Sequence, residues 1–182
     1  MNILLHTCCT PCSVMCIETL RAEGHEPTGY WSNPNIHPLL EYRHRQNAMI
    51  DYARTIGMEL VIQGEYGLRR FITGIYPDFD HRCAACYRMR LEETARYAAE
   101  HGYDAFTTTL LISPYQKHDI IRRTAEQMEN AYKIPFMYSD FRPFFREGQQ
   151  KARDMGLYMQ KYCGCIFSEE ERYAEKHKTP RP

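Results

Sequence analysis

Seven of the eight cysteines in this chain of 182 residues lie in three short groups, and thiols placed in this way can bind metals or carry out redox chemistry. The groups are "HTCCTPCS", "RCAACY" and "YCGCIFS", and they contain Cys8, Cys9, Cys12, Cys83, Cys86, Cys163 and Cys165. Gly164 separates two of these thiols without adding a Cβ that would keep both sulfurs from turning towards one centre. Cys16 stands apart, and we expect it to be a small buried side chain of the helix core.

The number of clustered thiols exceeds what the simplest cysteine sites require. A structural zinc ion takes four ligands, and a thioredoxin-like pair explains only the Cys-x-x-Cys of residues 83–86. An iron–sulfur cluster is held by about four cysteines, so the surplus predicts such a cluster together with a second metal or a redox-active pair. These thiols come from three distant segments, unlike the ligands of a ferredoxin, so the fold must assemble the site first.

Composition and charge indicate a globular protein of a reducing compartment. Hydrophobic residues make up 43% of the sequence, and 23 basic residues balance 23 acidic ones. No apolar run approaches the roughly 18 residues that a membrane span needs, and the first residues lack the basic region of a secretory signal. We therefore expect a cytoplasmic protein, because clustered thiols in that compartment more often bind metal than form structural disulfides.

Strand-like and helix-like segments alternate along the chain. Five apolar or β-branched segments are predicted to be strands: 2–6, 27–32, 58–63, 103–110 and 134–139. Five segments with helical start and stop signals or helical spacing are predicted to be helices: 11–24, 38–57, 65–75, 83–102 and 115–132. This alternation is typical of an open, doubly wound parallel α/β sheet with helices on both faces. We expect one domain over residues 1–182, with a frayed tail from about residue 173.

The predicted fold gives the first cysteine group a place in the molecule. Ligands of open α/β sheets bind in the crevice outside the carboxyl ends of the strands. Cys8 and Cys9 directly follow the first predicted strand, and "TTTLLISP" and "SDF" follow two later strands at the same edge. We therefore expect a cysteine-rich metal site at the carboxyl edge of the sheet, provided that the other two cysteine groups fold over that edge.

Several motifs, taken together and in this order, resemble the cobalamin-independent epoxyqueuosine reductases of the QueH family. They are "LLHTCCTPCS", "NPNIHPLLEYRHR", "RCAACYRMRLEETA", "FTTTLLISP", "SDFR" and "GLYMQKYCGCIFS". The resemblance covers about Leu4 to Ser168, which is nearly the whole chain. One departure is Met159, where the family usually has arginine.

The resemblance implies the last step of queuosine formation, in which an epoxide on the modified wobble base of a tRNA with a GUN anticodon is reduced to an alkene with loss of water. It also implies a scaffold of the HUP or PP-loop nucleotide-binding type. The phosphate-binding glycine loop of that scaffold is replaced here by "TCCTPCS", so we expect no nucleotide dependence. No G-x-G-x-x-G fingerprint is present, so we expect an external low-potential electron donor of the ferredoxin or flavodoxin type.

With this reaction in view, each cysteine group receives an expected role. Cys8, Cys9, Cys83 and Cys86 are the predicted ligands of a 4Fe-4S cluster. Cys163 and Cys165, with Cys12 as a further candidate, are predicted to hold an additional iron ion or to form the redox pair. The departing oxygen needs a general acid, for which the candidates are Asp140, Tyr162 and His6.

Binding of the RNA is expected to involve polar and basic residues near these motifs. Asn33 and Asn35 of "NPNI" are candidate substrate-binding residues, although Asn-Pro is also a common turn signal. Arginine or lysine contacts to phosphate and aromatic stacking on an unstacked base are the usual means of binding an RNA loop. The candidates for these contacts are Tyr42, Arg43, Arg88 and Arg90; ordinary helix-surface positions remain an equally open interpretation of them.

Two other functions are compatible with the same residues. The first is a zinc-binding RNA-interaction module without catalytic activity. The second is a tRNA thiolation or desulfuration enzyme on the same scaffold, because a metal cluster does not by itself identify the substrate. Brown colour in protein purified without oxygen distinguishes iron–sulfur from zinc.

Overall fold

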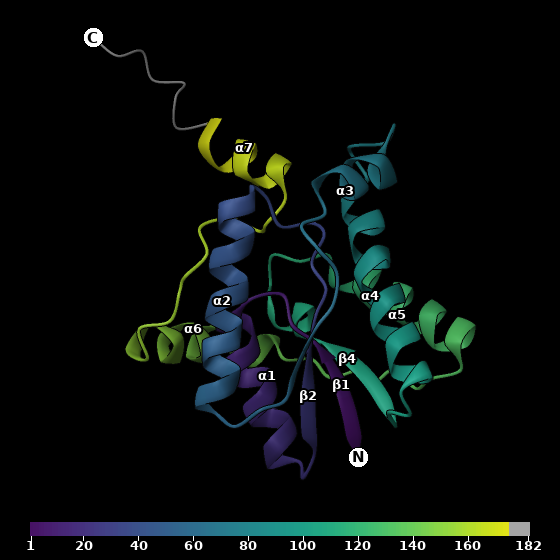
Figure 1. Cartoon of the computed structure of the whole chain (residues 1–182), viewed down its shortest axis with the longest axis vertical. Coiled ribbons are helices and arrows are strands. Elements are labelled where there is room, and N and C mark those ends of the chain that lie inside the picture. The colour runs from purple at the N-terminus through teal and green to yellow at the C-terminus, as the bar shows by residue number, and fades with distance from the viewer. Residues whose placement is uncertain (175–182) are drawn as a thin grey trace.

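Four parallel strands form the centre of the computed structural model, which describes residues 1–174 (Figure 1). They are β1 (Asn2–His6), β2 (Glu26–Trp31), β3 (Leu60–Ile62) and β4 (Ala105–Thr108), in the order β3-β2-β1-β4. β1 is central, with Leu4 opposite Thr28 of β2 and Phe106 of β4. All pairs are parallel, as the alternation of strands and helices predicted.

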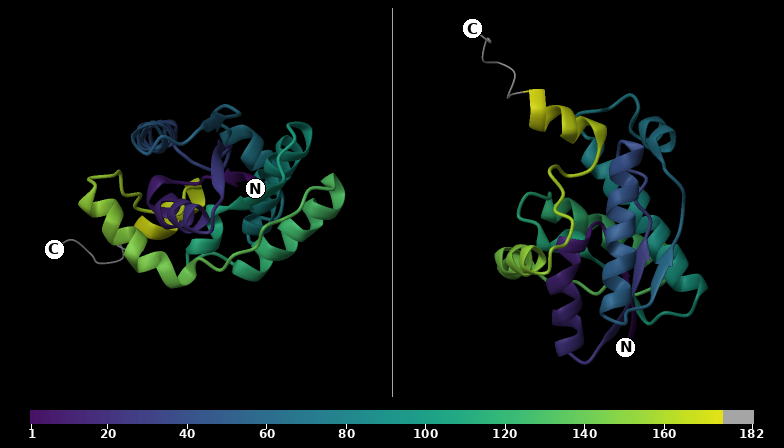
Figure 2. Two further views of the ribbon diagram at one scale, coloured as in Figure 1. Left: turned by 90° about the horizontal axis from the view of Figure 1, so that it is seen from below. Right: turned by 60° about the vertical axis from the view of Figure 1, so that its left-hand side comes forward.

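Helices cover both faces of this sheet. The helices are α1 (Thr10–Ala22), α2 (Leu39–Thr55), α3 (Leu68–Ile75), α4 (Arg82–Glu100), α5 (His118–Tyr132), α6 (Phe145–Asp154), α7 (Ile166–Ala174) and the 3₁₀ turns η1 (Thr109–Ile112) and η2 (Arg142–Phe144). α1 packs against α2 and α6, whereas α4 packs against α3 and α5 on the other side (Figures 1 and 2). This arrangement confirms the predicted doubly wound α/β fold.

The core is built around β1, because a central parallel strand is covered on both faces. Ile3, Leu4 and Leu5 of this strand are fully buried. Burying one such side chain stabilises the fold by about 1.5–3 kcal/mol. A rigid central strand therefore ends at the point where the first cysteine group begins.

β3 covers only Leu60–Ile62 of the predicted 58–63, and two further predicted strands are also shorter in the structure. Residues 134–139 form only an isolated bridge between Phe106 and Phe136, because Pro135 has no N–H to donate to a ladder. β4 ends at Thr108 rather than at residue 110, since the Thr108 hydroxyl accepts a hydrogen bond from the Leu110 N–H (3.2 Å) and caps η1. Both changes occur beside the carboxyl edge of the sheet.

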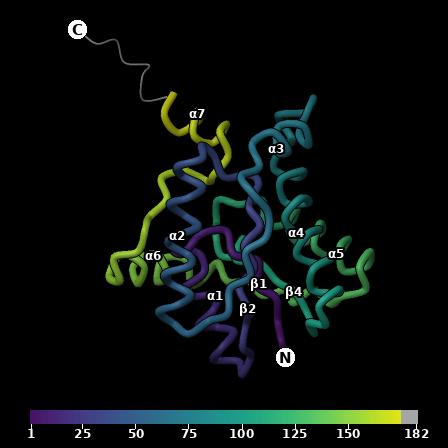
Figure 3. The backbone as a smooth tube through the Cα atoms, in the orientation of Figure 1, coloured from purple at the N-terminus to yellow at the C-terminus, as the bar shows by residue number. Residues whose placement is uncertain are grey.

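The last part of the described chain returns to this carboxyl edge. Figure 3 shows the segment after α6 running along α2 to α7. Neither α6 nor α7 was predicted from the sequence. Tyr173 and Ala174, expected to begin a frayed tail, lie in α7, and the rest of that prediction falls on 175–182, outside the described residues. Within the described part, no helix combines the length and the hydrophobicity needed to cross a membrane.

Candidate metal centre

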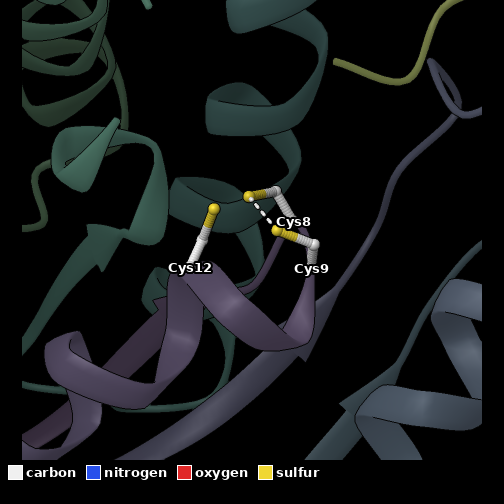
Figure 4. A group of neighbouring side chains, drawn as sticks. All are labelled: Cys8, Cys9 and Cys12. Atoms are coloured by element: carbon white, nitrogen blue, oxygen red, sulfur yellow. Dashed lines mark hydrogen bonds between the residues drawn. The ribbon is translucent and has the colours of Figure 1, made fainter. Parts of the chain in front are cut away.

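Cys8, Cys9 and Cys12 form a compact thiol triad where β1 meets α1. Their three sulfur atoms all lie within 4.8 Å of one another, and the Cys8 and Cys9 sulfurs are 3.7 Å apart (Figure 4). Cys9 precedes the first residue of α1, and Pro11 stands in the first turn, where its fixed φ suits a helix start. Cys12 is three residues after Cys9, so the two side chains lie on the same side of the helix.

Polar side chains from later in the chain surround the triad. The Thr109 hydroxyl donates to the Cys8 sulfur (3.3 Å), and the Gln160 side-chain amide donates to the Cys9 sulfur (2.9 Å). The pKa of Cys8 is well below its usual value because the thiols of Cys12 and Cys9 hydrogen-bond to its sulfur. Burial raises the pKa of Cys9. The triad therefore concentrates its negative charge on Cys8.

A second thiol group comes from the start of α4 and from the loop before α7. It consists of Cys83, Cys86, Cys163 and Cys165. Cys86 and Cys165 pack together in one buried cluster. Burial raises the pKa of Cys86 to about 12, the charge of Arg90 opposes this rise, and the charges of the other three thiols add to it. Cys163 is exposed and accepts a hydrogen bond from the Gln116 side-chain amide (3.3 Å), and the Ser168 N–H donates to the Cys165 sulfur (3.4 Å).

Arg45 on α2 attaches the second group's loop to the body of the protein. Its guanidinium pairs with Glu41 (2.7 Å) and donates to the carbonyl oxygens of Tyr162 (2.9 Å) and Cys163 (2.8 Å). A Cβ on Gly164 would lie only 3.4 Å from the Arg45 Nη1, so glycine permits this close approach. Arg45 is 2% exposed, although its sequence context, "EYRHRQ", suggested a basic patch.

A pocket of about 400 Å³ opens beside the triad. The three triad cysteines and Cys163 line it together, so the two thiol groups meet at one cavity. Tyr115 and Phe145 form part of its wall, with ring centroids 5.8 Å apart, and Lys161 contributes a positive charge. The cavity has the size of a small-molecule site, for which roughly 300–1,000 Å³ is typical.

The three predicted general acids lie in different surroundings. Asp140 does not line the pocket, and its hydrogen bonds with Arg142 hold its pKa at about 2, so it is ionised at neutral pH. His6 is fully buried, and burial lowers its pKa to about 4, which keeps the imidazole neutral. Tyr162 does line the pocket, but its hydroxyl donates to the His37 carbonyl oxygen.

The predicted RNA contacts divide into buried and exposed residues. Tyr42 and Arg90 are 5% and 2% exposed, so their side chains offer no surface to an RNA, and for these two residues the prediction is corrected. The Tyr42 hydroxyl instead accepts a hydrogen bond from the Trp31 Nε1 (3.3 Å). Arg43 and Arg88 are exposed and remain predicted contacts.

Asn33 and Asn35 are both buried beneath the site and do not line the pocket. The Asn33 amide donates to the Thr7 carbonyl oxygen (2.9 Å), and the Asn35 amide lies against Gly164. Their side chains therefore support the backbone around the two thiol groups, in keeping with the turn interpretation of "NPNI". Met159 is half-buried against the core, so an apolar side chain suits its position.

The structure brings Cys12 together with Cys8 and Cys9, whereas the sequence assigned Cys12 to the second metal or redox pair. Helical geometry explains this difference, because Cys12 and Cys9 share one side of α1. Cys86 packs with Cys165, and the two ligand sets stay predictions. Cys16 is fully buried in the main core, as expected.

Sequence reasoning did not single out several residues of this centre. They are Arg45, Thr109, Tyr115, Gln116, Phe145, Gln160 and Lys161. Four of them stand within quoted motifs: Arg45 in "NPNIHPLLEYRHR", Thr109 in "FTTTLLISP", and Gln160 and Lys161 in "GLYMQKYCGCIFS". Membership of these motifs is the signal that could have identified them. Nothing in the sequence showed that Arg45 is buried while its neighbour Arg43 is exposed.

Fold and site together define an α/β protein with a cysteine-lined pocket at the carboxyl edge of its sheet, which is where proteins of this fold class bind their ligands. The family model for "Epoxyqueuosine reductase QueH" matches residues 3–171. This chain belongs to the QueH family, and it is therefore an oxidoreductase.

Individual relatives agree with this assignment. A protein named epoxyqueuosine reductase QueH from Dehalococcoides mccartyi is 36% identical over 174 residues, covering 96% of each chain. One of the same name from Thermotoga maritima is 35% identical, covering 97% of this chain and 94% of the relative. A solved structure, a predicted subunit of tRNA methyltransferase from Methanocaldococcus jannaschii, matches with a TM-score of 0.57 at 12% identity. It covers 85% of this chain and 76% of that one, and it shows similarity of fold only.

Proposed function

We propose that this protein reduces epoxyqueuosine to queuosine at the wobble position of tRNA in the cytoplasm, without cobalamin. The observation that carries the proposal is the meeting of both thiol groups at one pocket in a chain of the QueH family. The proposed substrate is a tRNA with a GUN anticodon. A ferredoxin or flavodoxin type of protein supplies the electrons.

The separation of the sulfur atoms supports a division of the metals between the two groups. Two sulfurs bound at about 2.3 Å to one tetrahedral ion lie about 3.8 Å apart. The Cys8 and Cys9 sulfurs are 3.7 Å apart, so the triad fits a single iron ion. Cys83, Cys86, Cys163 and Cys165 supply the four thiolates that a 4Fe-4S cluster takes.

The metal centre, when bound, supplies the electrons for removal of the epoxide oxygen, and the protein's own residues hold the substrate beside it. An RNA base can enter the pocket only after leaving the stack of the anticodon loop, and flipped or splayed bases are commonly held against aromatic rings. Tyr115 is 84% exposed at the pocket and packs edge-on against Phe145. We assign these two rings to the base, and Arg43 to phosphates.

The reaction also consumes two protons, because the oxygen leaves as water. Lys161 lines the pocket, and its ammonium group can donate a proton. Arginine does not release its proton under these conditions, so Arg172, which also lines the pocket, is suited to binding rather than to acid catalysis. We therefore assign the donation of one proton to Lys161, and solvent water supplies the other.

A single anaerobic experiment tests the function. The protein reconstituted with iron and sulfide is incubated with a chemical reductant and epoxyqueuosine-bearing tRNA, without cobalamin, and the nucleosides are analysed by mass. We expect a loss of one oxygen atom from the modified base. An unchanged epoxide at full iron and sulfide occupancy contradicts the reaction, and zinc without acid-labile sulfide favours the RNA-interaction module instead.

A further inference from the structure

Arg90 on α4 is a buried cation beside the thiols. Its side chain is 2% exposed. The Nη2 donates to the Cys86 sulfur (3.2 Å), the Nε donates to the Cys86 carbonyl oxygen (3.2 Å), and the guanidinium lies 5.6 Å from the centre of the Tyr87 ring. Among residues 1–174, no aspartate or glutamate forms an ion pair with it. Burial of a charge is unfavourable unless an opposite charge compensates it.

The other buried arginine of this site, Arg45, shows what the usual compensation looks like. It is equally buried, but Glu41 neutralises its charge at 2.7 Å. The charge of Arg45 is therefore compensated by a carboxylate of the polypeptide itself. Arg90 has no such carboxylate partner, so its counter-ion must come from another kind of group.

Thiols are the groups near Arg90 that can carry negative charge. Burial alone lowers the pKa of Arg90, yet the charges of Cys86, Cys163 and Cys8 together raise it. Cys8 belongs to the triad and the other two thiols to the second group. Within the described residues, the Cys86 sulfur is the group that accepts a hydrogen bond from the charged end of Arg90 and can itself become an anion.

We propose that Arg90 is the internal counter-cation of the metal centre and a positioning residue that raises its reduction potential. The inference rests on the proposed function only in that the thiols must hold metal. Thiolate ligands give a bound metal site negative charge, and one-electron reduction adds more. A buried cation stabilises the more negative state, and hydrogen bonds to the sulfurs act in the same direction.

The experiment compares Arg90→Met and Arg90→Lys with Arg88→Met in the full chain, reconstituted anaerobically. Arg88 lies on the same helix, is exposed and pairs with Glu92, so it is a matched control. Iron and sulfide content are measured first, and the potential is then obtained by redox titration of the cluster absorption. We expect Arg90→Met to lower the equilibrium constant for one-electron reduction at least tenfold, which is about 59 mV. Arg90→Lys and Arg88→Met should retain a potential close to that of the unmodified protein.

Equal potentials in Arg90→Met and Arg88→Met at equal cluster content overturn the proposal. If Arg90→Met has native circular dichroism but takes up no cluster, the cluster content of Arg90→Lys decides the question. Cluster uptake by Arg90→Lys supports a role of the positive charge. Absence of the cluster from both variants shows that only the shape of arginine matters and overturns the proposal.

Zinc affinity separates this proposal from the proposed function. If the unmodified protein forms no iron–sulfur cluster, the reaction assignment fails, but zinc chloride still tests the charge at the thiols. Arg90→Met should bind zinc at least tenfold more weakly than Arg88→Met. Equal zinc affinities overturn the role of Arg90 independently of any iron chemistry.

Discussion

The two thiol groups of this protein are assembled in different ways. The triad of Cys8, Cys9 and Cys12 lies within five consecutive residues, where a central strand with a buried core segment leads into the first turn of α1. The second group combines the start of α4 with the loop before α7, which Arg45 and His37 attach to the rest of the molecule.

The two groups therefore differ in what keeps them in place: a short continuous segment holds the triad, and long-range contacts hold the second group. The triad depends on the β1–α1 turn, which persists as long as the core does. The second group depends on a few polar contacts, and exposed or loosely attached segments open at lower free energy than the core. Substitutions at these contacts are therefore expected to separate the thiols of the second group from one another, while the triad keeps its geometry.

The largest expected effect comes from the cysteines themselves. Cys86→Ala should abolish the broad cluster absorption and turnover, whereas Cys9→Ala should abolish turnover and reduce iron content with the absorption retained. Cys16→Ala is the control: it removes a buried sulfur from the core and should cost about 1–2 kcal/mol with activity retained. Anaerobic spectra, iron analysis and turnover provide the measurement. If Cys9→Ala also abolishes the absorption, the division of metals between the two groups is wrong.

The next largest effect is expected at Arg45. Arg45→Met removes the ion pair of Glu41 and leaves two carbonyl groups without this donor, and breaking such a buried pair costs about 3–5 kcal/mol. Urea unfolding should show this loss, and the loop before α7 should become accessible to limited proteolysis. Arg54→Met on the same helix is the control, because that arginine is 76% exposed and its ion pair is worth less than about 1 kcal/mol. Equal losses in the two variants contradict the role of Arg45.

Acid should weaken the second group through His37. Its Nδ1 accepts a hydrogen bond from the Ile166 N–H (3.2 Å), and burial lowers its pKa to about 4. Below pH 6.5 the unfolded chain binds a proton that the folded chain takes up only near pH 4, so stability present above pH 6.5 is lost as the pH falls. The loss is about 3 kcal/mol over that window. His37→Gln should show a shallower dependence of unfolding free energy on pH, and an unchanged slope contradicts this account.

The smallest effect is expected at Asp140, outside both groups. Asp140→Asn should retain turnover and cost less than about 1 kcal/mol, because the pair with Arg142 is 37% and 44% exposed at its two side chains. Its pKa of about 2 means that this small contribution is present above pH 4 and is lost as the pH falls towards 2. Steady-state kinetics provide the check. A loss of about 100-fold or more in turnover would restore Asp140 as the general acid.

Much of the fold was predictable because local patterns and tertiary structure agree. β1, α1, α2 and α4 lie close to the predicted ranges, since apolar spacing and helix-ending glycines are encoded locally. The strand predicted over 134–139 is reduced to an isolated bridge. Strand propensity favoured it, but Pro135 has no N–H to donate to a ladder. α6 and α7 were not predicted.

By itself the sequence determined which thiols stand in short groups and at which edge of the sheet the first of them lie. The thiols are evident from residue type and spacing, and the position of Cys8 and Cys9 follows from the strand that precedes them. Only the tertiary structure decided that Cys12 joins this pair, that Cys86 packs with Cys165, and that Arg45 and Arg90 are buried while Arg43 and Arg88 are exposed. The physical reason is that burial and charge compensation depend on residues far apart in the chain, and such contacts leave no periodic signal in the sequence.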